Sequence, residues 1–233
     1  MLRKLLRLIQ GLTGTAEKKE PADVVARLRY NPYDPERPTP AQRELLVQLE
    51  NMRAARNIKD DDWLTVAGFD NFAMMTAMGR PRLCYDSHLI AGGLMFWLTD
   101  AHAKAIGQAL RPSLKALRLN LTRPQEDGFT LMAGAVAPGV KISELYISHR
   151  SGDEVTATEA RGIARLAGRL ACETLHVWAG EFDPGALDAL ADELGKLGNK
   201  TLRAADVCDV SKPEPEDRII HPGLRALAEA NSA

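Results

Sequence analysis

Apolar positions recur at helical spacing along the first dozen residues of the chain. These positions are Leu2, Leu5, Leu6, Ile9 and Leu12. Basic residues take the opposite side, so residues 1–16 are predicted to form an amphipathic helix. A polar linker follows, and a short isolated helix cannot bury its apolar side by local folding. The five apolar residues are therefore a candidate docking surface for the body of the protein, for another chain or for a membrane surface.

Residues 17–40 are predicted to be a linker that contains a short helix and a proline-rich connector. Four prolines between positions 32 and 40 lack an amide donor and fix φ, which favours an extended chain. A helix is expected to begin at Thr39-Pro40, because threonine caps and proline suits the first helical position. Acidic residues at 60–62 favour another helix, over about 62–78. The N-terminal third is thus expected to be helical.

Strand-like patterns dominate the next part of the chain. Residues 83–98 are mostly apolar, with a Gly-Gly bend. Residues 117–121 alternate between apolar and polar side chains, as a half-buried strand does. The polar turn at 124–128 leads into the apolar run 129–136, so these two runs are predicted to form a hairpin. Residues 140–148 are expected to add a third strand.

Helices return in the C-terminal part. A capping box at Thr156 and Glu159 predicts a helix over 157–174, and Asp183-Pro184 predicts the start of another. Short strands are expected at 175–179 and 202–210. The fold class that follows is α+β, in which a helical N-terminal third precedes a mainly antiparallel sheet with helices packed on one face. A single α+β domain is expected over 41–210, then a tail over 211–233 with a short helix. No internal repeat is evident.

Composition describes an ordinary globular protein. The chain has 233 residues, of which 45% are hydrophobic, and its formal net charge is −1. Three widely spaced cysteines suit a reducing compartment better than a disulfide framework, so a cytoplasmic location is expected. No apolar run approaches the length of a transmembrane segment. The near-zero net charge argues against a protein that coats nucleic acid.

The charge is unevenly distributed. Residues 80–123 contain seven basic and two acidic residues, whereas residues 124–233 are strongly acidic. The basic segment is a candidate anion-binding surface, although the acidic half can equally well neutralise it within the fold. The candidate anion-binding residues are Arg80, Arg82, Lys115, Arg118 and Arg123.

Motifs that would identify an enzyme are absent. The sequence has no phosphate-binding glycine loop, no nucleophile elbow and no cluster with metal-ligand spacing, so neither a cofactor nor a metal is predicted. Cys84 and His88 are the densest reactive pair, and a thiol beside an imidazole can act as a nucleophile. In an extended chain the two side chains lie beyond hydrogen-bond reach. An enzyme of unrecognised type centred on this pair therefore stays an alternative.

One short segment resembles a nucleic-acid-binding motif. Residues 164–168 (ARLAG) resemble the first helix and turn of bacterial repressor helix-turn-helix units. The pattern then departs, because Thr174 takes an expected apolar position. Arg161, Arg165 and Arg169 share a helix face that could contact phosphates, yet a single uninterrupted helix over 157–174 explains the same pattern.

The sequence as a whole favours a non-enzymatic intracellular interaction or regulatory protein. Its partner is expected to be another protein or a second copy, with the N-terminal amphipathic helix as the docking element. One alternative is a nucleic-acid-binding regulator that uses residues 80–123 or the helix 157–174. Peripheral membrane contact through the N-terminal helix is also left open, and the sequence identifies neither partner nor ligand.

Overall fold

A computed structural model of the chain was obtained, and it describes most of the sequence from residue 62 onward. The described residues are 39–40, 43–44, 47, 51, 62–66, 69–86, 99–121, 127–149, 154–209, 218–219 and 221–232. The predicted N-terminal helix with Leu2, Leu5, Leu6, Ile9 and Leu12, and most of the predicted linker, lie outside these residues. Among the described residues, no helix has the length and apolar character that a membrane crossing requires.

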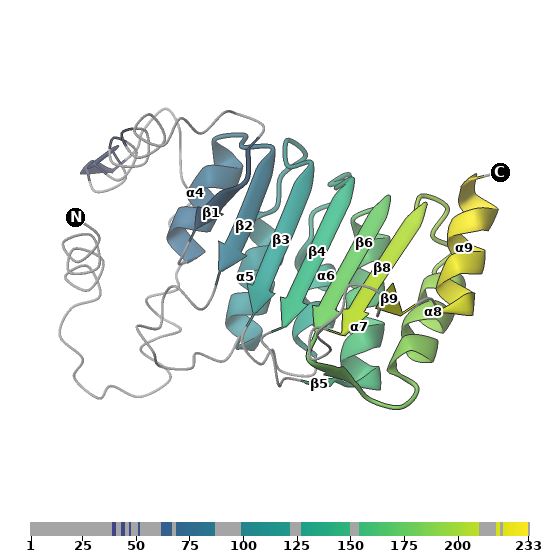
Figure 1. Ribbon diagram of the computed structural model, residues 1–233. Coiled ribbons are helices and arrows are strands. Elements are labelled where there is room, and N and C mark those ends of the chain that lie inside the picture. The colour runs from purple at the N-terminus through teal and green to yellow at the C-terminus, as the bar shows by residue number, and fades with distance from the viewer. Residues whose placement is uncertain are drawn as a thin grey trace, which may run out of the picture. The chain divides into compact units, whose positions relative to one another are not determined.

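The main element is a sheet whose strands follow one another in space as they do in sequence. The strands in spatial order are β1 (Leu64–Val66), β2 (Arg82–Asp86), β3 (Ala116–Leu121), β4 (Glu144–His149), β6 (Thr174–Ala179), β8 (Ala204–Asp209) and β9 (Arg218–Ile219). All pairings from β1 to β8 are parallel, and only β9 is antiparallel (Figure 1). The short strands β5 (Glu154–Val155) and β7 (Glu181–Phe182) form a separate parallel pair.

Helices connect the successive strands and lie on one face of the sheet. They are α4 (Phe69–Ala77), α5 (Asp100–Ala109), α6 (Gly128–Ala135), α7 (Ala157–Arg169) and α8 (Ala186–Lys196), and α9 (Pro222–Ser232) follows β9. Figure 1 shows α5, α6 and α7 behind the sheet. Each helix from α5 to α8 packs against the next. Parallel neighbours joined by right-handed crossovers place their helices on the same side, which explains this arrangement.

The strand–helix unit repeats, contrary to the prediction of no internal repeat. Leu117, Leu145, Leu175 and Ala205 are paired in register on adjacent strands, at intervals of 28, 30 and 30 residues. A buried apolar residue precedes each of them by three positions, and another follows each by two. Each unit thus has three buried or half-buried apolar positions with the spacing φ-x-x-φ-x-φ, where φ is an apolar residue, and neighbouring units share a continuous core, as in solenoid proteins.

The predicted antiparallel sheet is wrong. Residues 129–136, expected to be the second strand of a hairpin, belong mainly to helix α6, which buries Phe129, Met132 and Ala133 at helical spacing. The prediction of a helical N-terminal third also fails, because strand β1 occupies part of the segment expected to be one helix over 62–78. With α6 as a crossover helix, β3 and β4 must run parallel, and the fold is a parallel α/β repeat.

Candidate binding site on the open sheet face

The two faces of the sheet differ in whether described helices pack against them. Side chains alternate along β4 and β6 between buried and half-buried. The buried ones, such as Leu145 and Val177, face the helices. The others lie on the face without a described helix, which we call the open face. A strand with one covered side shows this period of two.

One row of side chains crosses the open face from strand to strand. Backbone register aligns the six positions, which we call the central row: Thr65, Cys84, Arg118, Tyr146, His176 and Asp206. From Cys84 to Asp206, each member is the variable residue between the two apolar positions of its strand. The repeat therefore fixes the backbone and leaves this row free to vary, which is how solenoid proteins build binding surfaces.

Arg118 lies at the centre of an aromatic cluster. Its guanidinium carbon is 4.9 Å from the ring centroid of Trp63, 4.9 Å from that of Tyr146 and 5.9 Å from that of Trp178. The Trp63 and Tyr146 rings meet edge to face at 5.5 Å, and the Tyr146 and Trp178 rings do so at 6.3 Å. Cation–π contacts of this kind contribute about 0.5–2 kcal/mol. The rings therefore hold the guanidinium in one place.

Arg118 has no acidic partner among the residues that the structure describes, whereas Arg82 on the same face does. Among the described residues, no carboxylate makes an ion pair with Arg118, and its buried Nε has no hydrogen-bond acceptor. Arg82 also lies over the Trp63 ring, at 5.5 Å, but its Nη2 donates to Glu144 Oε1 at 2.6 Å. As far as the described residues go, the positive charge of Arg118 is thus uncompensated in this cluster.

Tyr146 is held from two sides. Its hydroxyl donates to Glu144 Oε2 at 3.2 Å, and its ring stacks on His176. Burial is the main cause that raises the pKa of Tyr146, and the neighbouring Glu144 raises it further. The phenol therefore stays neutral and keeps its donor proton. His176 Nδ1 lies 3.3 Å from Asp206 Oδ2, which continues the network along the central row.

The structure separates the five candidate anion-binding residues. Arg82 and Arg118 meet on the open face over Trp63. Arg80 is buried, and Lys115 is exposed just before β3. Arg123 lies outside the described residues. Charge alone could not identify the aromatic partners, because Trp63, Tyr146 and Trp178 are far apart in the sequence. The variable position of the repeat could have placed Tyr146 beside Arg118, but not the two tryptophans.

Cys84 is not arranged as an activated nucleophile. Its side chain is buried, and Asn120 Nδ2 lies 3.5 Å from its sulfur. Burial is the main cause that raises the pKa of the Cys84 thiol, so little thiolate forms at neutral pH. The other half of the predicted pair, His88, lies outside the described residues. In the described part of the chain, no cluster of histidine, cysteine and acidic side chains could hold a metal ion.

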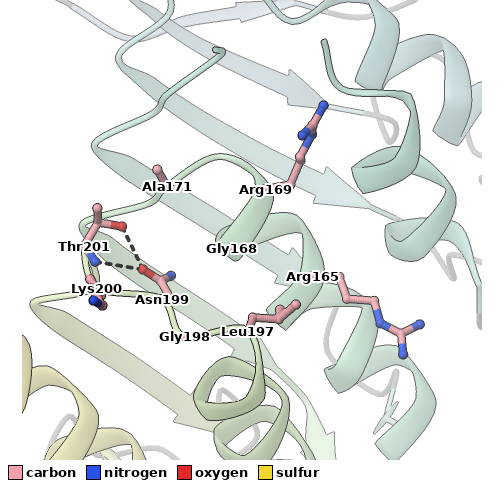
Figure 2. Close-up of a pocket in the computed structure, with 9 residues that line it drawn as sticks. All are labelled: Arg165, Gly168, Arg169, Ala171, Leu197, Gly198, Asn199, Lys200 and Thr201. Carbon is pink, nitrogen blue, oxygen red and sulfur yellow. Dashed lines mark hydrogen bonds between the residues drawn. The ribbon is translucent and has the colours of Figure 1, made fainter. Parts of the chain in front are cut away.

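The arginines of α7 are largely engaged within the fold. Arg165 Nε lies 2.7 Å from Glu193 Oε1, and Arg169 Nη2 donates to the Val136 carbonyl at 2.8 Å. Both line a shallow depression of about 400 Å³ with Lys200. Figure 2 shows these three cationic side chains pointing in different directions, so they do not converge on one anion.

The predicted helix over 157–174 ends early. Helix α7 ends at Arg169, and residues 174–179, where a helix-turn-helix unit would place its second helix, form strand β6. The helix-turn-helix interpretation is therefore wrong. Comparison with known proteins finds no matching family model, no significantly similar curated protein and no significantly similar solved structure.

Proposed function

We propose that the protein is a non-enzymatic interaction protein that binds another protein through the open face. The observation that carries this proposal is the half-buried cluster of Trp63, Arg118, Tyr146 and Trp178. Tryptophan, tyrosine and arginine are the residue types that dominate binding energy in protein interfaces. Here they are gathered on the side of the sheet that lacks a described helix.

The composition of the face favours a protein over a nucleic acid. The aromatic rings around Arg118 could in principle stack with bases. Three carboxylates share the same face, however: Asp86, Glu144 and Asp206. A phosphate backbone would meet these negative charges along most of its path, and unfavourable charge pairs of this kind exclude wrong partners. The predicted docking helix at the N-terminus stays a second proposed contact with the same partner.

In-cell photo-crosslinking tests this function. A photoreactive phenylalanine analogue replaces Ala204, which is exposed at the start of β8, or Arg161, which is exposed on α7. We expect one defined protein adduct from position 204, lost when Trp178→Ala is added, and none from position 161. Adducts from 161 alone, nuclease-sensitive adducts, or no adduct from either position would each contradict the proposal.

A further inference from the structure

We propose that Arg118 binds one carboxylate of the partner, carried by an acidic side chain that apolar residues flank in a peptide segment. This inference rests on the proposed function and names the chemistry at its centre. The site consists of the Arg118 guanidinium and the rings of Trp63, Tyr146 and Trp178.

Among the described residues of the open face, charge pairing leaves Arg118 without an anionic partner. Glu144 Oε1 forms an ion pair with Arg82 Nη2 at 2.6 Å, and Asp206 Oδ2 lies 3.3 Å from His176 Nδ1. Asp86 accepts from Asn120 Nδ2 at 3.4 Å. Each acidic side chain of the face therefore already has a polar neighbour. Among the described residues of this cluster, Arg118 alone has a full charge without a counter-charge. An incoming anion therefore gains the most electrostatic interaction energy beside Arg118.

The guanidinium is also short of hydrogen-bond acceptors. It offers five N–H donors, and none of them has an acceptor in the described part of the structure. Three rings fix its position and leave its donors unused. A carboxylate accepts two parallel N–H bonds from such a planar fork. Because the fork is already held in place, little conformational entropy remains to be lost on binding.

The surroundings set the size and character of the ligand. Trp63, Tyr146 and Trp178 are each half-buried, so they present apolar area beside the charge. An acidic side chain with apolar neighbours uses both features. A polyanion does not suit the site, because Glu144 lies on the strand next to Arg118. A peptide segment with one carboxylate fits the single uncompensated charge.

The test uses the full-length protein and random peptides of about twelve residues displayed on phage. Peptides enriched on the wild type are synthesised, and their Kd is measured for the wild type and for Arg118→Gln, Arg118→Lys, Trp178→Ala and Lys115→Gln. Lys115→Gln is the matched control, because it removes an equal charge beside the same strand but outside the cluster. In each peptide, the acidic residue is also changed to its amide.

We expect enriched peptides to share one aspartate or glutamate beside an apolar residue. Arg118→Gln should weaken binding about tenfold or more, and Arg118→Lys should also weaken it, because an ammonium lacks the planar fork. Lys115→Gln should change Kd less than about twofold. Changing the acidic residue of the peptide to its amide should weaken binding to the wild type by the same factor. On Arg118→Gln, the amide peptide should bind no more weakly than the acidic peptide. This last comparison leaves the protein unaltered, so it stands even where the Arg118 variants fold poorly.

Two failures are distinguishable. If enriched peptides lose binding on Trp178→Ala but share no acidic residue, or show no coupling to Arg118, the carboxylate site is overturned and the proposed function stands. If no peptide is enriched, or if peptides bind Trp178→Ala as well as the wild type, both are overturned. Tighter binding of an oligothymidylate than of any peptide, with steep salt dependence, would assign the face to nucleic acid and overturn both.

Discussion

The rings of Tyr146 and His176 lie parallel, with centroids 4.1 Å apart and planes 5° apart, on adjacent strands in direct register. Cross-strand pairs of this kind stabilise a sheet by about 0.2–1 kcal/mol. His176→Ala should therefore lower the free energy of unfolding by about 1 kcal/mol, measured by urea denaturation. It should also weaken partner binding, because Tyr146 loses the ring that orients it.

Thr174→Ala is the matched control for the stack, since Thr174 lies two residues earlier on the same strand and face. We expect it to change both measurements less than His176→Ala does. Equal effects of the two substitutions would show that the stack has no special role in holding Tyr146.

Gly107, on α5, lies tightly against helix α6. A Cβ built at this position would lie 2.3 Å from the Met132 carbonyl oxygen, on α6. Alanine gains about 1 kcal/mol in helix propensity over glycine, but overpacking a rigid backbone contact costs about 1–3 kcal/mol or more. Gly107→Ala should therefore lower the free energy of unfolding by about 2 kcal/mol, measured by urea denaturation.

The opposite result is expected at Gly134, on α6, where a Cβ would meet nothing within 4 Å. Gly134→Ala should raise the free energy of unfolding by about 0.5–1 kcal/mol, because only the propensity difference remains. Stabilisation by both substitutions would contradict the close packing of α5 on α6.

Local signals in the sequence predicted several helices well. The capping box at Thr156 marks the start of α7, where its hydroxyl accepts from the Glu159 amide at 3.2 Å. Cap geometry is a local property, so spacing alone can reveal it. The fold class depended on one short helix instead. Helix α6 has only eight residues and is mostly apolar, and a short apolar run does not distinguish a buried helix from a strand.

The binding surface depended on register, which a single pass along the chain did not reveal. Arg82 and Arg118 were predicted from charge, but their aromatic neighbours lie on or next to strands with long intervening segments. The repeat that aligns those strands was hidden because Cys172 and Ala205 stand where other units have larger aliphatic residues. Recognising the repeated spacing of apolar residues would have placed Arg118, Tyr146 and His176 in one row.

The three cysteines should differ in reactivity towards a thiol reagent. Burial raises the pKa of Cys172 to about 12, and it also raises that of Cys84. Cys208 is only half-buried, on the open face. At neutral pH, Cys208 should react first with iodoacetamide, and Cys172 only on unfolding, as peptide mass spectrometry would show. Labelling of Cys172 at the rate of Cys208 in folded protein would contradict its burial.

Glu154 should make stability depend on pH. The hydrogen bond and charge of Asp183 are the main causes that raise its pKa above 4.5, and Glu181 opposes it across the β5–β7 pair. The folded state therefore holds this proton more tightly than the unfolded state. Stability should fall as pH rises through the raised pKa. Glu154→Gln should remove that loss and raise the thermal midpoint at pH 7 but not at pH 4.

Glu173→Gln is the control for this pH effect, because Glu173 is exposed outside the β5–β7 pair. It should leave the difference between the two thermal midpoints unchanged. A thermal midpoint at pH 7 that falls on Glu154→Gln would mean that the carboxylate stabilises the strand pair instead of opposing it.

A deeply buried ionisable pair joins β4 to α7. His149 Nε2 lies 3.3 Å from Glu159 Oε1, and both side chains are almost fully shielded, with 1% and 6% exposed. In the neighbouring units, Leu121 and Ala179 take the position of His149, so the pair replaces an apolar contact of the repeat. Removing one partner of such a pair takes a close polar contact away from the other buried group, which costs about 3–5 kcal/mol.

Glu159→Ala should therefore lower the free energy of unfolding by about 3 kcal/mol in urea, whereas Arg161→Ala, at an exposed position of the same helix, should change it by less than about 0.5 kcal/mol. Replacing both partners, by His149→Leu with Glu159→Leu, should recover much of the loss, because two apolar side chains restore the pattern of the neighbouring units. Additive losses in the double variant would mean that the two groups act independently. A coupled result would identify the pair as a polar substitute for one layer of the repeat's apolar core.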